Sequence, residues 1–135
     1  MAFRHIGTSC ERVEDAALLT GRGRFMDDLP VPAGALHAAI LRSPHPHAEI
    51  RCINAEAALA LPGVAAVVTG VQVKALTRPF IVGVRSPIDH YPIAVDRARY
   101  VGEPVAVVLA RDRYVAEDAM ELIEVDYAPL DVAVD

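Results

Sequence analysis

The pattern of apolar and polar residues predicts two strand-helix-strand units. Residues 105–110, VAVVLA, form an apolar run with no polar side chain, which is typical of a strand buried on both faces. Asp112 follows as a helix N-cap, and apolar residues recur from Ala116 at i, i+3 and i+4, which predicts a helix to about residue 121. Residues 122–127 alternate in part as a strand does. Because such connections are usually right-handed and parallel, we expect parallel strands around this helix.

A second unit of the same kind precedes it. Residues 35–42 form a strongly apolar strand candidate, and residues 48–53 alternate so that Cys52 is expected to point into the core. Residues 54–60 predict a short helix with Asn54 as its N-cap, stopped by the Pro-Gly pair that follows. Residues 64–70 then predict a third buried strand.

The remaining segments are less regular. Residues 1–20 are interpreted as an irregular arm. Residues 19–25, LTGRGRF, are interpreted as a turn into a short strand, because a phosphate loop needs a preceding strand, a following helix and a Walker lysine. Residues 27–28 predict a solvated acidic turn. Residues 77–96 show no steady period and predict a long connection of the kind that often contacts a partner. Residues 1–135 are therefore expected to form a single α+β or α/β domain.

Composition narrows the possible partners. The 135 residues are enough to bury a core in one domain, and the formal net charge is −5, without the clustered Lys and Arg that nucleic-acid binding needs. No segment approaches the about 18 apolar residues of a membrane span. The two cysteines are in unlike contexts, which favours thiols and a cytoplasmic location. With glycine counted and tyrosine left out, about 56% of residues are apolar, against about 45–50% in average domains, so part of the surface is expected to contact another chain.

A proline-rich connection carries the candidate site residues. Ser43, Pro44, His45 and His47 lie between the two strands of residues 35–42 and 48–53. His45 and His47 form an HxH pair, but a metal site needs three or four ligands. The other ligands would come from distant carboxylates or from histidines without suitable spacing, namely His5, His37 and His90. We therefore interpret the connection as stiffened by proline, with its histidines as polar caps or partner-interface groups.

Four segments occur in order along nearly the whole chain. They are ERVEDAALLTGRGRFMDDL, LHAAILRSPHPHAEI, LPGVAAVVTG and RYVGEPVAVVLARDRYVAEDAMELIEVDYAPL. Together they resemble the N-terminal α/β-hammerhead domain of the large subunit of molybdenum hydroxylases, the family of xanthine dehydrogenase, aldehyde oxidase and carbon monoxide dehydrogenase. The resemblance implies an α+β fold, a mixed sheet with two crossover helices.

The resemblance also implies a division of labour. In that family, molybdenum on a pterin cofactor hydroxylates or oxidises the substrate with oxygen from water, and partner subunits or domains with iron–sulfur clusters and FAD remove the electrons. The pterin-binding loops and the glutamate base lie in the domains that follow the hammerhead domain. No catalytic, cofactor-binding or metal residue is therefore expected here. The acids interpreted instead as turn and helix-surface groups are Glu103, Glu117, Glu121 and Glu124.

Two functions stay open. In the first, the chain is a fragment or separate subunit of a molybdopterin-dependent oxidoreductase, with a structural and assembly role beside a pterin-binding molybdenum subunit, and is inactive alone. In the second, it is a free-standing, non-catalytic module that binds a ligand or a protein. The chain's end at Asp135 is compatible with a truncated protein, a separately encoded subunit or a free-standing relative.

Overall fold

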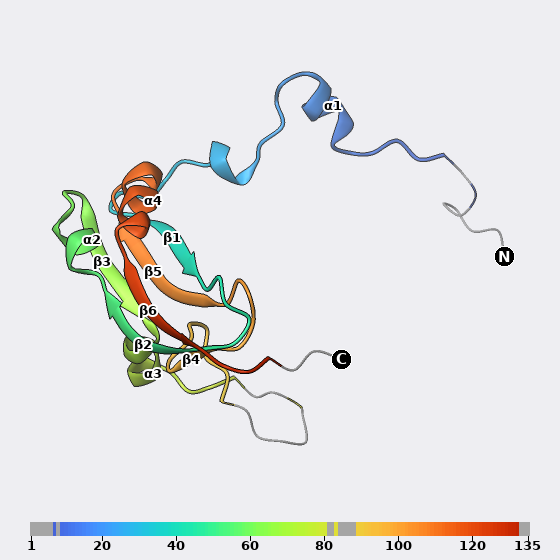
Figure 1. The fold of residues 1–135 in the computed structure, drawn as a ribbon. Helices are drawn as coiled ribbons and strands as arrows, with labels where there is room; N and C mark the ends of the chain where they lie inside the picture. The colour runs from blue at the N-terminus through green and yellow to red at the C-terminus, as the bar shows by residue number, and fades with distance from the viewer. Residues whose placement is uncertain (1–6, 8, 81–82, 84–88, 133–135) are drawn as a thin grey trace. The chain divides into compact units, whose positions relative to one another are not determined.

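The computed structural model describes residues 7, 9–80, 83 and 89–132. The chain divides into two units, Met1–Ala33 and Gly34–Asp135 (Figure 1). His5 and residues 81–82 and 84–88 of the expected long connection lie outside the described residues. None of the helices in the described ranges has the length and apolar composition needed to cross a membrane.

The first unit holds two short helical segments. Helix α1 (Asp15–Leu19) lies in the stretch expected to be an irregular arm, and the 3-10 helix η1 (Met26–Asp28) follows. The short strand expected within residues 19–25 was a wrong prediction, because these residues form a turn and irregular chain before η1. The local reason is a C-terminal cap: Thr20 Oγ1 donates to the Ala16 carbonyl at 2.6 Å, and Gly21 takes a φ of 68°. The expected acidic turn at residues 27–28 is exposed, as predicted, within η1.

The central strand of the second unit is the one predicted from the apolar run. β5 (Pro104–Ala110) lies between β1 (His37–Arg42) and β3 (Val64–Thr69), and both pairings are antiparallel. Val108 is opposite Ala39 on one side and Val67 on the other. We call this three-stranded sheet, with the order β1-β5-β3, sheet A.

A second three-stranded sheet, sheet B, has the order β4-β2-β6 and is joined to sheet A by the connection between β1 and β2. β2 (Ala48–Asn54) lies between the two-residue β4 (Arg97–Ala98) and β6 (Glu124–Pro129), again with antiparallel pairing throughout. The register of β2 and β6 shifts between Ile50 and Cys52. This irregularity interrupts the alternation of β2 and leaves Cys52 exposed, so its assignment to the core was wrong.

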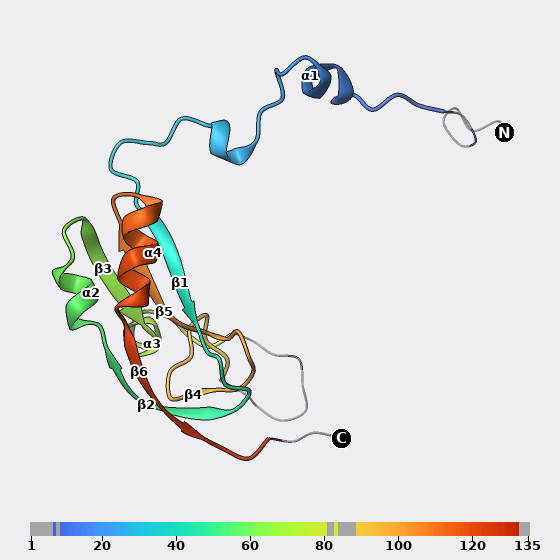
Figure 2. The ribbon, with the colours of Figure 1, turned by 45° about the horizontal axis from the view of Figure 1, so that its top comes forward.

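Each predicted crossover helix leads from one sheet to the other. α2 (Glu56–Ala60) connects β2 to β3, and α4 (Arg113–Glu121) connects β5 to β6. The expected parallel pairing was therefore wrong, although the α+β class is confirmed. Only two residues, Leu122 and Ile123, separate α4 from β6. β6 continues in the direction of α4 beyond sheet A (Figure 2).

The predicted Asp112 cap is confirmed, whereas Asn54 lies one residue before the N-cap of α2, which is Ala55, so its assignment as the cap was wrong. One helix was not predicted. The Asp112 carboxylate accepts a hydrogen bond from the Val115 N–H at 2.9 Å, and Asn54 Oδ1 accepts from the Glu56 N–H at 3.1 Å. The unpredicted helix is α3 (Gly70–Leu76), which begins directly after β3 with a capping box of Thr69 and Gln72. The seven residues of α3 are too few to show a clear helical period of apolar residues in the sequence.

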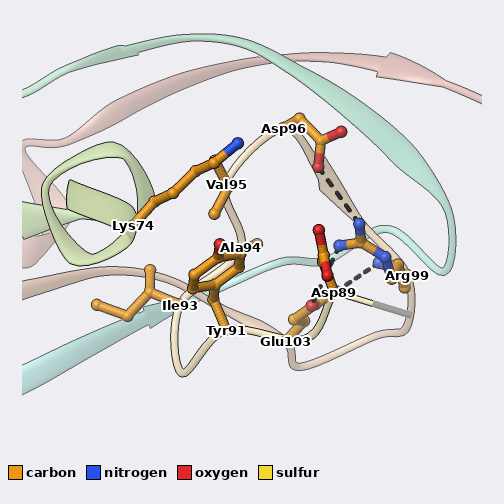
Figure 3. A pocket seen from close by; sticks show the side chains of 9 residues that line it. All are labelled: Lys74, Asp89, Tyr91, Ile93, Ala94, Val95, Asp96, Arg99 and Glu103. Atoms are coloured by element: carbon orange, nitrogen blue, oxygen red, sulfur yellow. Dashed lines mark hydrogen bonds and ion pairs between the residues drawn. The ribbon is translucent and has the colours of Figure 1, made fainter. Parts of the chain in front are cut away.

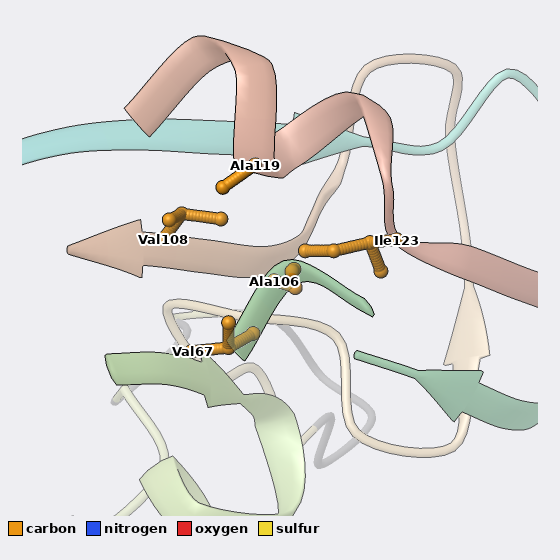
Figure 4. Packing of buried hydrophobic residues seen from close by; sticks show 6 residues of the cluster. Val67, Ala106, Val108, Ala119 and Ile123 are labelled. Atoms are coloured by element: carbon orange, nitrogen blue, oxygen red, sulfur yellow. The ribbon is translucent and has the colours of Figure 1, made fainter. Parts of the chain in front are cut away.

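The core lies between one face of sheet A and two helices. Its members are small, and Figure 4 shows how they meet. The buried cluster consists of Ala58, Val67, Ala106, Val108, Ala119 and Ile123. A neighbouring cluster adds Ala39, Ala110 and Ala116. The side chains of β5 alternate, however, and Val107 and Leu109 on the other face are only half-buried. The prediction of burial on both faces was therefore wrong for this part of the strand.

Candidate functional site

The connection between β1 and β2 is hydrogen-bonded to the Gly-Glu-Pro turn before β5. The Ser43 N–H donates to the Glu103 carbonyl at 2.9 Å, and the Gly102 N–H donates to the Ser43 carbonyl at 2.8 Å. Arg42 Nη1 donates to the Gly102 carbonyl at 2.8 Å. Gly102 has a φ of 87°, a conformation that glycine adopts without strain. These bonds fix the predicted site residues against a turn about 60 positions later in the chain.

The four candidate interface residues do not have equal access. Ser43 is 2% exposed, and its hydroxyl both accepts from the His45 N–H at 3.0 Å and donates to the His45 carbonyl at 3.1 Å. Ser43 therefore shapes the turn from inside the domain. Pro44 is exposed, whereas His45 and His47 are half-buried. A partner at this connection would meet Pro44 and the histidine edges and would not reach Ser43.

The two histidines have different neighbours within the fold. The rings of His45 and Tyr127 lie 4.8 Å apart, centroid to centroid, in a tilted arrangement. His47 Nδ1 lies 2.7 Å from the carbonyl oxygen of Asp131, so the Nδ1–H donates there. Burial raises the pKa of Tyr127, and a hydrogen bond to Ser43 opposes that rise. Within the described residues, no group of three His, Cys, Asp or Glu side chains is placed to hold a metal ion.

A polar cavity of about 140 Å³ lies beside this junction (Figure 3). It is lined by Lys74, Asp89, Tyr91, Ile93, Ala94, Val95, Asp96, Arg99 and Glu103. Arg99 organises one wall: its Nη2 lies 3.3 Å from Asp96 Oδ1, and its Nη1 donates to the Arg97 carbonyl at 3.1 Å. Lys74 enters from α3 on the opposite wall.

Glu103 is the buried charge of the site. It is 2% exposed, its carboxylate accepts a hydrogen bond from the Arg99 backbone N–H, and Oε1 lies 3.9 Å from Arg99 Nη1. These partners offset the cost of removing the carboxylate from water. Glu103 had been predicted as a turn or surface acid; it lies in the turn but is buried. The other three acids of that prediction are exposed, namely Glu117, Glu121 and Glu124.

Sequence reasoning missed the residues that line the cavity. Asp96 and Arg99 flank β4 and are three residues apart, whereas Lys74 comes from α3, so no local spacing links Lys74 to the other two. Arg99 also borders a second, more open cavity of about 250 Å³ with Pro46, His47 and Val132. With two cations and three carboxylates around the first cavity, this end of the unit suits small polar or charged groups.

Comparison with known proteins identifies a protein family and sequence relatives that match most of the chain. The family of the aldehyde oxidase and xanthine dehydrogenase a/b hammerhead domain matches residues 20–131. The carbon monoxide dehydrogenase large chain of Afipia carboxidovorans is 41% identical over 130 residues, which are 96% of this chain and 16% of that protein. The xanthine dehydrogenase molybdenum-binding subunit of Escherichia coli O157:H7 is 38% identical over 90% of this chain and 17% of its own length.

Solved structures agree with the sequence relatives. Quinoline 2-oxidoreductase from Pseudomonas putida 86 matches with a TM-score of 0.81 and 46% identity, over 93% of this chain and 16% of that one. The Cu,Mo-containing carbon monoxide dehydrogenase matches with a TM-score of 0.81 and 42% identity, over 96% and 16%. The chain thus spans 16% of the length of these relatives. From its sequence and its fold, this chain belongs to the α/β-hammerhead domain family of aldehyde oxidases and xanthine dehydrogenases.

Proposed function

We propose that this chain is the hammerhead portion of the large subunit of a molybdopterin-dependent hydroxylase or dehydrogenase, with a structural and assembly role. The observation that carries the proposal is the match of residues 20–131 to the hammerhead family, combined with coverage of 16% of the matched large chain. The matched residues run through both units of the chain. For this reason we treat residues 1–135, including the arm of residues 1–20, as one hammerhead domain.

The proposed partner is a pterin-binding molybdenum subunit or domain, joined in the full complex by iron–sulfur and FAD subunits. Support comes from relatives named as a large subunit of nicotine 6-hydroxylase and as a subunit of the 6-hydroxypseudooxynicotine dehydrogenase complex, both from Paenarthrobacter nicotinovorans. We place this assembly in the cytoplasm, in keeping with the exposed Cys52 thiol, which suits a reducing compartment.

The polar cavity does not fit the pterin cofactor. Pockets that enclose cofactors or drug-sized ligands are about 300–1,000 Å³, whereas this cavity is about 140 Å³. Its charged walls also bond mainly to each other, since Arg99 is engaged by Asp96 and Glu103. We therefore assign the pterin to the partner and no step of the chemistry to this chain.

The test is co-expression with a tagged pterin-binding polypeptide. We expect the two chains to co-purify, with molybdenum found by elemental analysis in the complex, and we expect the isolated chain to reduce no dye with any added substrate. Stoichiometric molybdenum in the purified chain alone would contradict the proposal. So would substrate-dependent dye reduction by the chain alone.

The second candidate is a free-standing, non-catalytic binding module. The observation in its favour is the polar cavity, where the Lys74 ammonium faces a wall of charged groups. This function requires that the chain binds a small polar ligand without any partner. Calorimetric titration of the isolated chain with small dicarboxylates, with a Lys74→Met variant as control, distinguishes it from the assembly role.

A further inference from the structure

Sheet A has an aliphatic face that no described helix covers. Strand alternation and register place two rows of side chains on it, and we call these six residues the open face. The rows are Ile40, Val107 and Val68, and Ala38, Leu109 and Ala66. None of the six carries a polar group. The opposite face holds Val67, Ala106 and Val108 and is the one buried by helices.

The exposure of the two faces shows the asymmetry. α2 and α4 both pack on the buried cluster, through Ala58 and Ala119, so both lie on the same side of the sheet (Figures 2 and 4). On the open face, Ile40 is 42% exposed, and Val107 is half-buried even at the centre of the sheet, whereas Val108 next to it is 0% exposed. Only the β5 end at Val105 is buried, where the Ala94 N–H donates to the Pro104 carbonyl at 2.8 Å.

The size of the open face limits what can cover it. Three strands about 4.8 Å apart and same-face residues about 6.8 Å apart give an area of about 200 Å². A stable two-protein contact buries about 800 Å² on each partner. A second copy seated on this face alone would therefore fall well short. The occupant must be a body that also contacts other surfaces of the domain. A body large enough to do so is the rest of a large chain such as that of carbon monoxide dehydrogenase, of which the match covers only 16%.

We propose that the open face is the docking surface for the polypeptide that corresponds to the rest of the large subunit. This inference rests on the proposed function and names the surface through which the assembly forms. An aliphatic surface without charge requires an apolar counterpart, which is typical of permanent rather than transient contacts.

The test introduces charge on the open face at positions that the fold tolerates. Ile40→Lys and Ala38→Lys change exposed residues of an edge strand, and Leu59→Lys is the matched control, since Leu59 is 54% exposed on α2. The probe is the Afipia carboxidovorans carbon monoxide dehydrogenase large chain without its matched segment, co-expressed with each variant. Circular dichroism melting checks that the probe and each variant are folded, so that a loss of association reports on the contact itself.

We expect the parent chain and the Leu59→Lys variant to co-purify with the probe to the same extent, within twofold. Ile40→Lys and Ala38→Lys should reduce co-purification at least tenfold. Co-purification of folded Ile40→Lys and Ala38→Lys at the parent's level would overturn the docking surface but leave the proposed function in place. A parent chain that fails to associate would overturn both. An isolated parent that forms a dimer, lost in Ile40→Lys by light scattering, would assign the face to a second copy instead.

Discussion

Replacing Val108 by alanine tests the packing of the central strand. Val108 is 0% exposed and belongs to the cluster that α4 covers through Ala119. The change removes two methyl groups, which at about 0.8 kcal/mol per buried carbon amounts to about 1.6 kcal/mol of lost transfer free energy. A residual cavity adds to this, because Ala106 and Ala119 are too short to fill the space and are fixed in a strand and a helix. The total loss expected is about 2–3 kcal/mol.

The matched control is the same change one residue earlier. Val107→Ala removes the same atoms from the same strand, so any loss of strand propensity is common to both variants. Val107 lies on the open face and is only half-buried, so water and the neighbouring Ile40 already share its surroundings. We expect a loss of at most about 1 kcal/mol. The difference between the two variants isolates the contribution of helix packing.

Urea unfolding followed by circular dichroism measures both losses, with the slope compared to confirm that the unfolded states are alike. Losses that agree within error would refute the one-sided packing of sheet A. A large loss at Val107 in the isolated chain would further mean that the open face is covered by the chain itself, and the docking surface would fall with it. A small loss at Val108 would instead place α4 away from the sheet.

Three further predictions concern close packing and titration. A Cβ at Gly70 would lie 1.9 Å from the Ala94 carbonyl oxygen, so Gly70→Ala should cost about 1–3 kcal/mol or more in urea unfolding, and Gly83→Ala, in open space, should cost nothing measurable. The hydrogen bond from the Val115 N–H lowers the pKa of Asp112, so its stabilisation is lost as pH falls through the folded pKa, and Asp112→Asn should flatten the acid melting profile. Burial raises the pKa of Tyr127, so the neutral phenol stabilises the fold below about pH 10, and this stabilisation is lost as the pH rises through the folded pKa. The melting temperature of Tyr127→Phe should therefore fall less steeply with rising alkaline pH than that of the parent.

The sequence pattern identified those elements whose signals are local. The apolar run of β5 marked the centre of sheet A, and the period that begins at Ala116 marked α4. Asp112 was identified as a cap because a side-chain acceptor at that position needs only the next three residues. Family membership was also recognisable, since several modest segments kept one order over residues 11–130, and the family match over residues 20–131 confirms it.

Features that depend on distant partners were not predictable in this way. An apolar run does not reveal whether one face or both are covered, so Val107 was expected to be as buried as Val108. The parallel pairing failed because the two residues after α4 carry β6 into another sheet. The register shift in β2 depends on β6, about 70 residues later, and only that pairing exposes Cys52.

In the candidate site, too, features with a local sequence signal were predictable and features that depend on distant residues were not. Its proline-rich connection was found from sequence, because prolines and polar residues between two strands are a local signal. The buried role of Ser43 was not, since it depends on the Gly-Glu-Pro turn that holds Glu103. A lone glutamate in a turn is usually exposed. The Arg99 N–H and guanidinium offset the free-energy cost of burying the Glu103 carboxylate, and they are not visible as partners in the sequence pattern.

The size of the buried side chains connects the fold to the proposed assembly role. Among the described residues, the largest fully buried side chains are Glu103, Val105 and Val108, and alanines supply much of the rest of the core. Alanine lets α2 and α4 approach sheet A closely but removes little apolar area from water on folding. We expect a unit built in this way to have a modest margin of stability, and binding to a partner that recognises only the folded state adds to that margin by mass action. The open face holds larger aliphatic residues, Ile40, Val68, Val107 and Leu109, so covering it would bury apolar surface that the core itself does not use.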